Sequence, residues 1–359
     1  MDKYQVMKSC LNFFVDKKTI IPDFDYSAID DLAYKHRISP IIKYACMIDD
    51  RFRCNEIRSR HYQRIYNTCN VFRKLDEKSI PYAVIKGAYL DKIAYKNLGL
   101  RSSNDIDILI DKKNYATLCE ILKSEGFVCG YYDKEKDVIK KYSRDLILYN
   151  YLYTHQAATY VKRVKVDDVW YLIKVDINFS VTWGEDLDGY KNSSKILNNL
   201  HYVEYEGIRY KVLTPEYFLL QLCLHGFRDM NSIVLIYKNK YSLRLLCDVY
   251  YYIVNDLEYL NADKFVDIVK QFGYEKSIYH ILYYVREVFS DNNWVTYVMN
   301  KLGENSKKWV SLFGLTDEER KVWNISFSER ILCDNLFEKI KPMLTDSDIN
   351  KVNSIMNNM

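Results

Sequence analysis

Two aspartates separated by a single residue are the first feature of this sequence that could do chemistry. Asp105 and Asp107 open the segment Asp-Ile-Asp-Ile-Leu-Ile, in which acidic and aliphatic residues alternate before the segment becomes wholly apolar. Side chains alternate between the two faces of a β-strand, so we expect both carboxylates on one face and Ile106 in the core. Neighbouring carboxylates repel one another, and crowding raises their pKa unless a cation lies between them. The pair therefore predicts a strand with a cation-binding face.

A hard divalent cation would resolve this repulsion. Mg²⁺ prefers oxygen ligands and keeps open positions for phosphate oxygens. Two such ions held by a set of carboxylates can activate an attacking hydroxyl and stabilise a leaving pyrophosphate. Asp176 is the candidate for a third acid, because it is the lone acid in the apolar, β-branched segment Ile173–Asn178. An Asp-x-Asp pair also occurs in exposed strands and calcium loops, so the pair alone does not establish catalysis.

Lys86 and Gly87 stand where a phosphate-binding turn is expected. They follow the short apolar segment Tyr82–Ile85 and precede a helical pattern from Ala88 to Lys96. The amino end of a helix offers backbone amides to a triphosphate, and glycine permits close approach. Lys86 would add a positive charge for the phosphates. The alternative interpretation is that Lys86 is a surface lysine before a turn.

The elements that must position these residues predict an α+β protein. Residues 1–78 have helical periodicity, including a long amphipathic run from Arg51 to Lys74 with basic side chains on its outer face. Strand patterns at 82–85 and 105–110 follow, then a helix at 112–124 ended by Gly126, and strand patterns as far as about residue 182. We expect three parts: an N-terminal helical region (1–78), an α/β core (79–213) and a C-terminal helical domain (214–359).

The third part begins after a predicted hairpin over 202–213, whose turn is Glu206-Gly207. Thr214 and Pro215 are typical of a helix start, with Thr as the N-cap and Pro as the first helical residue. Helical patterns then cover residues 215–228, 240–255, 262–272, 276–290 and 293–302.

The motifs together resemble a known superfamily. Val84-Ile85-Lys86-Gly87-Ala88-Tyr89-Leu90, followed by Arg101-Ser102-Ser103-Asn104-Asp105-Ile106-Asp107-Ile108-Leu109-Ile110, is similar to the polymerase-β-type nucleotidyltransferases. More narrowly, it resembles a bacterial family of uncharacterised nucleotidyltransferases that carries Lys-Gly-x-x-Leu before Arg-x-x-x-Asp-x-Asp. The resemblance covers roughly residues 80–255, and includes Val175-Asp176-Ile177 as the strand of the third acid.

The resemblance implies a small mixed sheet in which Asp105, Asp107 and Asp176 hold two Mg²⁺ or Mn²⁺ ions. It implies transfer of a nucleoside monophosphate from an NTP such as ATP to a hydroxyl or phosphate acceptor, with Lys86, Gly87, Arg101 and Ser103 on the nucleotide. Two positions depart from the pattern. Ala88 stands where the superfamily has Ser, so that hydroxyl is missing unless Ser102 or Ser103 replaces it. Asn178 stands where the narrower family often has His.

Two histidines are further candidates. His155 precedes the strands that lead to Asp176, and His225 lies in the helix after the hairpin. Each could lie beside the site or on its acceptor side. The alternatives are a structural His155, and a helix–helix hydrogen bond between His225 and Asp248.

Composition excludes several classes. Nearly half of the residues (48%) are hydrophobic, so the chain folds. Fifty-two basic residues balance 48 acidic ones, so the charge indicates no evident DNA-binding surface. The 34 tyrosines fit boundaries of the core, with base stacking as the alternative. Nine scattered cysteines without a Cys-x-x-Cys pair predict reduced thiols, and no apolar run approaches the roughly 18 residues of a membrane span. We expect a cytoplasmic protein that does not enter membranes.

Three functions remain open. The first is an enzyme that transfers a nucleoside monophosphate to a small molecule, peptide, protein or RNA. The second is a toxin-like or regulatory member that modifies RNA or protein, which salt-sensitive binding of a macromolecule would reveal. The third is a binding protein that retains the fold without the chemistry. The pattern of three acids favours activity, whereas Ala88 favours the third alternative.

Overall fold

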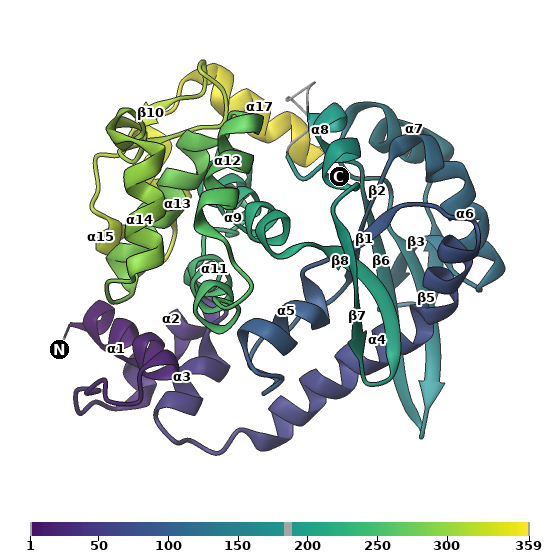
Figure 1. The fold of residues 1–359 in the computed structure, drawn as a ribbon, viewed down its shortest axis with the longest axis horizontal. Coiled ribbons are helices and arrows are strands. Elements are labelled where there is room, and N and C mark those ends of the chain that lie inside the picture. Colours follow the sequence, from purple (N-terminus) through teal and green to yellow (C-terminus); the bar gives the residue numbers. More distant parts are fainter. Residues whose placement is uncertain (1, 183–188, 358–359) are drawn as a thin grey trace. The chain divides into compact units, whose positions relative to one another are not determined.

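The computed structural model describes residues 2–182 and 189–357, and the chain divides into two units (Figure 1). The sheet unit is Arg51–Gln221, and the helical unit combines Met1–Asp50 with Leu222–Met359. This division differs from the expected boundaries at residues 78 and 213. The reason lies in helix α4, Arg51–Glu77, which packs against the strands of the sheet unit. The first fifty residues pack instead with the C-terminal helices.

A mixed sheet organises the sheet unit and confirms the α+β class. Its order is β1-β2-β6-β5-β3-β4. The strands are β1 Tyr82–Ile85, β2 Ile106–Ile110, β3 Val128–Asp133, β4 Val138–Lys141, β5 Tyr160–Val166 and β6 Val169–Asn178. Strand β2 runs parallel to β6, and the other pairs in this sheet are antiparallel. A parallel pair needs a long crossover, which here contains α6, β3, β4, α7 and β5.

Helices and a hairpin complete this unit. They are α4, α5 Gly87–Ala94, η2 Lys112–Asn114, α6 Tyr115–Ser124, α7 Arg144–Tyr153, α8 Gly189–Ile196, β7 Leu200–Tyr205, β8 Ile208–Leu213 and the start of α9 Pro215–Asn231. Helix α7 lies in the region where strands were expected. Its start is set by Ser143, whose hydroxyl accepts a hydrogen bond from the amide of Leu146 at 3.2 Å. The aromatic and aliphatic run that follows has no clear helical periodicity, so its sequence favoured strand.

The hairpin is confirmed, and its turn residues Glu206 and Gly207 both have positive φ, as tight hairpin turns require. Pro215 begins α9 as expected. The N-cap prediction for Thr214 is wrong in one respect. Its carbonyl accepts the first helical hydrogen bond, from Phe218, but its buried hydroxyl bonds to nothing in the described part of the chain.

Helix α4 buries one stripe of side chains against β6, β8, α5 and α6. The stripe has helical spacing and contains Ile57, His61, Arg64, Thr68, Val71 and Leu75. Arg58, Arg60 and Arg73 are exposed, as the expected basic outer face requires. Arg64 contradicts that expectation, because its place in the repeat turns it into the protein interior.

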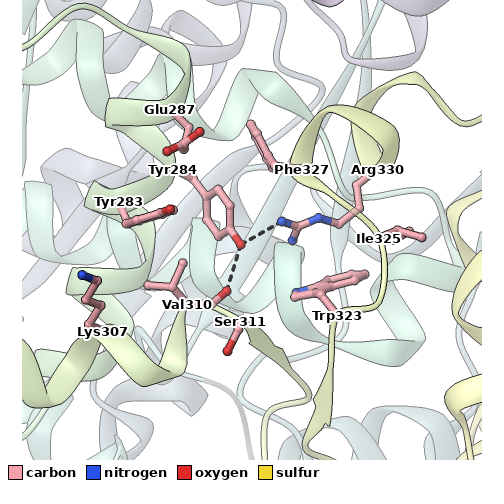
Figure 2. Close-up of a pocket in the computed structure, with 10 residues that line it drawn as sticks. All are labelled: Tyr283, Tyr284, Glu287, Lys307, Val310, Ser311, Trp323, Ile325, Phe327 and Arg330. Carbon is pink, nitrogen blue, oxygen red and sulfur yellow. Dashed lines mark hydrogen bonds between the residues drawn. The ribbon is translucent and has the colours of Figure 1, made fainter.

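The helical unit is built from short helices around an aromatic-rich core. They are α1 Lys3–Val15, η1 Tyr26–Ala28, α2 Asp30–Lys35, α3 Ser39–Ala45, α10 Ile233–Tyr237, α11 Leu243–Asn255, α12 Ala262–Phe272, α13 Glu275–Val288, α14 Asn293–Leu302, η3 Glu304–Trp309, α15 Phe327–Leu332, α16 Leu336–Ile340, η4 Lys341–Met343 and α17 Asp346–Asn357, with the short strands β9 Leu312–Phe313 and β10 Lys321–Val322. The Tyr251 hydroxyl ties α11 to α1 through the carbonyl of Leu11 at 2.9 Å. A pocket of about 390 Å³ opens beside α13 (Figure 2).

All nine cysteines are free thiols, as expected. Within residues 2–182 and 189–357, no helix combines the length and the apolar character that crossing a membrane requires.

Gly99 lies in the turn that leads to the acidic strand, and we predict that Gly99→Ala destabilises the sheet unit. Its φ is +72°, and a Cβ there would overlap the carbonyl oxygen of Cys54. Gly207→Ala is the matched control, because Gly207 has a φ of +78° but nothing within 4 Å of the added carbon. We expect Gly99→Ala to lose about 2 kcal/mol more than the control in urea unfolding, since it adds overlap to the same backbone strain. Equal losses would contradict this account.

Candidate active site

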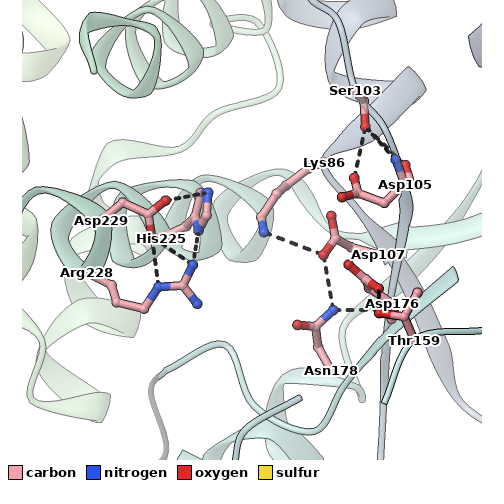
Figure 3. A network of polar contacts seen from close by, with 10 residues as sticks. All are labelled: Lys86, Ser103, Asp105, Asp107, Thr159, Asp176, Asn178, His225, Arg228 and Asp229. Atoms are coloured by element: carbon pink, nitrogen blue, oxygen red, sulfur yellow. Dashed lines mark hydrogen bonds and ion pairs between the residues drawn. The ribbon is translucent and has the colours of Figure 1, made fainter. Parts of the chain in front are cut away.

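The parallel pairing of β2 with β6 brings two acids of the sequence prediction together. In this register Asp107 lies opposite Asp176. On the other side of β2, Ile85 of β1 pairs with Asp107, so Lys86 leaves the sheet beside the same carboxylate. The Lys86 Nζ lies 3.7 Å from Asp107 Oδ1 (Figure 3). Residues from separate segments thus converge on one face of the sheet.

The Asp107 side chain is largely buried, with 13% of its surface exposed. Its pKa is raised to about 6, first by burial and then by the negative charges of Asp105 and Asp176, while Lys86 and Asn178 oppose the shift. The Asn178 amide donates to Asp107 Oδ1 at 3.3 Å. Relative to a solvated aspartate, the shift favours the protonated form, because burial penalises the charge and Lys86 offsets that penalty only in part. A cation in this position would reverse that preference.

Asp176 has the same conflict in a milder form. Burial and the charge of Asp105 raise its pKa, while hydrogen bonding to Thr159 and the charge of Lys86 lower it. The Thr159 hydroxyl donates to Asp176 Oδ1 at 2.6 Å. Thr159 directly precedes β5, the antiparallel neighbour of β6, so sheet pairing positions this donor. The hydroxyl therefore holds the carboxylate in one orientation.

Asp105 directly precedes β2, and its carboxylate is held by its own loop. The Ser103 hydroxyl lies 3.1 Å from Asp105 Oδ1 and 3.0 Å from its carbonyl oxygen (Figure 3). In the part of the chain that the structure describes, no three His, Cys, Asp or Glu side chains are grouped closely enough to hold a metal ion. The structure thus pairs Asp107 with Asp176, whereas Asp105 affects their pKa values from a carboxylate engaged with Ser103.

The turn at Lys86-Gly87 is strained, as sites for ligands often are. Lys86 has φ +66° and ψ −142°, a conformation that residues with a side chain rarely adopt, and Gly87 follows with φ +59°. Helix α5 begins here without a side-chain cap. The turn therefore lies at the positive end of the α5 dipole, which attracts anions. The phosphate-binding role expected of this turn stays a prediction.

A buried carboxylate braces the loop between α5 and β2. Asp91 is fully buried on α5, and its Oδ1 accepts a hydrogen bond from the backbone amide of Arg101 at 3.1 Å. Its carbonyl accepts another from the amide of Asn97 at 3.0 Å. The His61 Nδ1 of α4 lies 3.7 Å from Asp91 Oδ2, and burial lowers the pKa of this histidine. Arg101 itself is buried, so the loop that carries Ser103 is fixed from within.

Arg64 is the charged residue that the sequence prediction missed. It is buried on α4, and its Nε and Nη1 have no hydrogen-bond partner among the described residues. Burial lowers its pKa to about 10, and the charge of Asp105 opposes that shift. The guanidinium therefore lies close enough to act electrostatically on Asp105. Its position in the buried stripe of α4, three residues after His61, was the signal that could have identified it.

Comparison with protein families decides the relationship of this chain. A family model described as "Uncharacterised nucleotidyltransferase" matches residues 23–290. The chain belongs to this nucleotidyltransferase family. No curated protein and no solved structure matched the chain. The family match includes the acids, the Lys-Gly turn and both candidate histidines, and it confirms the resemblance inferred from the motifs.

The candidate histidines of this nucleotidyltransferase lie in different units. In the sheet unit, the carbonyl of His155 accepts a hydrogen bond from the amide of Phe179 at 2.8 Å, so its backbone borders the end of β6. In the helical unit, His225 Nε2 lies 3.6 Å from Asp229 Oδ2, and Arg228 Nη2 lies 3.0 Å from its Nδ1 (Figure 3). Their roles beside the acids or toward an acceptor stay predictions.

We predict a characteristic pH dependence for the metal-free protein. Folding raises the pKa of Asp107 from 3.8 to about 6. Between these values the folded chain binds this proton more tightly than the unfolded chain, so stability falls as pH rises through that window. Asp107→Asn removes this loss, and should raise the free energy of unfolding by on the order of 1 kcal/mol at pH 7 with EDTA.

Urea unfolding from pH 4.5 to pH 8 measures the effect. The exposed Asp168 provides the control Asp168→Asn, which should leave the pH slope of the native chain unchanged. The assignment fails if Asp107→Asn and the native chain lose stability equally over this range.

Proposed function

We propose that this protein is a metal-dependent nucleotidyltransferase that moves a nucleoside monophosphate from an NTP to a hydroxyl or phosphate acceptor and releases pyrophosphate. The observation that carries the proposal is the register that sets Asp107 opposite Asp176, with Lys86 Nζ 3.7 Å from Asp107. A phosphate-binding turn and an acidic pair thus adjoin within one sheet. Membership of the nucleotidyltransferase family supports the reaction class.

We infer that Asp107 and Asp176, joined by Asp105 after its side chain moves, would hold a pair of Mg²⁺ or Mn²⁺ ions. The raised pKa values of Asp107 and Asp176 reflect crowded, buried carboxylates, and hard divalent cations bind oxygen ligands of this kind. Asp105 would complete the set by exchanging its hydrogen bond from Ser103 for a metal contact. When bound, such ions would supply positive charge that polarises the reacting phosphate and favours ionisation of the attacking hydroxyl.

The protein groups around the acids would fix their orientation. Thr159 holds Asp176 and Asn178 holds Asp107, so neither carboxylate must reorganise when substrate arrives. Arg64 would add a buried positive charge whose field acts on Asp105. Asn178, which stands where the family often has histidine, would supply its side-chain amide as the hydrogen-bond donor to Asp107.

The triphosphate would lie against the amino end of α5. Gly87 would let the backbone approach the phosphates closely, and the positive end of the α5 dipole would attract them. Lys86 would exchange part of its attraction to Asp107 for the phosphates. Ser103 would contribute to the nucleotide site by orienting Asp105, to which its hydroxyl is hydrogen-bonded. Arg101 would contribute by fixing the loop that carries Ser103, through the hydrogen bond of its amide to Asp91.

We predict that an NTP stabilises the protein only when a divalent cation is present. A thermal-shift measurement would compare ATP, GTP, CTP and UTP, each at about 1 mM, with Mg²⁺ and with EDTA. At about 100 times the dissociation constant, binding adds about 2.7 kcal/mol to stability. Lys86→Gln should weaken the effect, because it removes a phosphate contact but no metal ligand. An equal shift in EDTA would contradict metal-assisted binding.

We predict that Asp105→Asn and Asp107→Asn each lower turnover at least about 100-fold, since each removes a ligand from a catalytic ion. Label from an α-³²P-labelled NTP would be followed into small-molecule, protein and RNA fractions of an extract of the source cells. Circular dichroism would confirm that both variants fold, and Asp168→Asn is the control acid outside the site. Full activity in both variants would remove these acids from the mechanism.

A further inference from the structure

The pocket of about 390 Å³ in the helical unit is lined by residues other than those of the candidate active site (Figure 2). It is bordered by α13, by η3 and the segment after it, and by the segment from β10 to α15. Four aromatic side chains and three charged ones contribute to its walls. The side chains that matter are Tyr283, Tyr284, Glu287, Lys307, Trp323 and Arg330.

Arg330 is a buried cation without an anion. Only 4% of it is exposed, and its Nη2 donates to the Tyr284 hydroxyl at 2.8 Å while its Nε donates to the Ser326 carbonyl at 3.4 Å. Both acceptors are neutral, and in the described ranges no carboxylate lies within ion-pair distance of Arg330. An uncompensated buried charge is costly, so it requires an explanation.

Arg320, in the same unit, shows the contrast. Its guanidinium stacks on Trp309 with the Cζ 3.8 Å from the ring centroid, and it also forms an ion pair with Asp317. Arg330 has the stacking without the ion pair. Its Cζ lies 4.3 Å from the ring centroid of Trp323 and 4.9 Å from that of Tyr284. Rings attract a cation, but they do not neutralise it.

An anion that binds in the pocket could pair with Arg330, because this residue is part of the lining. Nη1 of Arg330 makes no hydrogen bond to the described residues, and the guanidinium lines the pocket between aromatic walls (Figure 2). A guanidinium binds carboxylate and phosphate oxygens through parallel N–H donors. Exposed Lys307 adds positive charge to the lining, whereas exposed Glu287 adds negative charge. Their opposite effects on an anionic ligand can be measured separately.

We propose that this pocket binds a small aromatic oxyanion, a flat ring that bears a carboxylate or a phosphate group. The oxyanion pairs with Arg330, and the ring packs against the side chains of Trp323 and Tyr283. This site is independent of the nucleotidyl transfer proposed for the sheet unit. The alternative is a purely structural role, in which Arg330 links α15 to α13 through its hydrogen bond to Tyr284.

Isothermal titration of the full chain would separate these alternatives. The probes are benzoate, phenyl phosphate, acetate and inorganic phosphate, each up to about 10 mM. The proposal expects the ring-bearing probes to bind at least about tenfold more tightly than the ringless ones, because stacking adds to the ion pair. Tighter binding of benzoate or of phenyl phosphate would tell which oxyanion the site prefers. Absence of binding by both ring-bearing probes overturns the proposal.

Variants test the assignment to Arg330. Arg330→Lys should weaken binding at least about tenfold, because a single ammonium cannot reproduce the paired donors. Arg320→Lys is the matched control and should leave the affinity unchanged. If Arg330→Lys unfolds the chain, variants of the two exposed charged residues of the lining test the proposal instead. Lys307→Gln should weaken binding of the probes and Glu287→Gln should strengthen it, each by about threefold at low salt. Unchanged affinity in both Lys307→Gln and Glu287→Gln would overturn the proposal.

Discussion

Two carboxylates lie opposite one another where β2 runs parallel to β6, and burial prevents either from spreading its charge into water. The surrounding polar groups partly offset the repulsion between the two carboxylates. Lys86 enters from β1, and the Thr159 hydroxyl and Asn178 amide donate to the acids from the neighbouring strands. These groups only lessen the conflict, since both pKa values stay raised. The proposed cation would relieve this conflict, which links the sheet register to the proposed reaction.

The same register imposes demands on the backbone. A parallel pair cannot be closed by a hairpin, so a long crossover separates β2 from β6. At the end of β1 the chain must turn at once into α5, and Lys86 adopts a positive φ to do so. Strain at ligand-binding turns persists when the surrounding packing enforces it. Here that packing includes buried Asp91, which ties α5 to the loop that returns to β2.

Local patterns in the sequence were sufficient for much of the fold. The alternation from Asp105 onward identified β2, and the helix predicted at 262–272 is α12, which the structure shows capped by Asn261 and ended by left-handed Gly273. The acids were proposed from their spacing and their role stays a prediction, whereas the family match confirms the resemblance. What local patterns cannot supply is the partner of each strand. The pairing of β2 with β6 joins distant segments, and only tertiary packing selects it. Alternation along a strand also does not describe the loop before it, so the pattern did not show that Ser103 engages Asp105. Arg64 was interpreted as a surface residue although its helical spacing placed it inside.

The helical unit is discontinuous, because the sheet unit is inserted between its first fifty residues and its remainder. During synthesis on the ribosome, α1 to α3 therefore emerge long before α11 and α13, against which their unit is built. The whole sheet unit is translated in that interval. Since domains generally fold as units during synthesis, the acidic cluster can assemble while the apolar faces of α1 and α3 still await their partners. The order of translation thus allows the sheet unit to fold before the helical unit is complete.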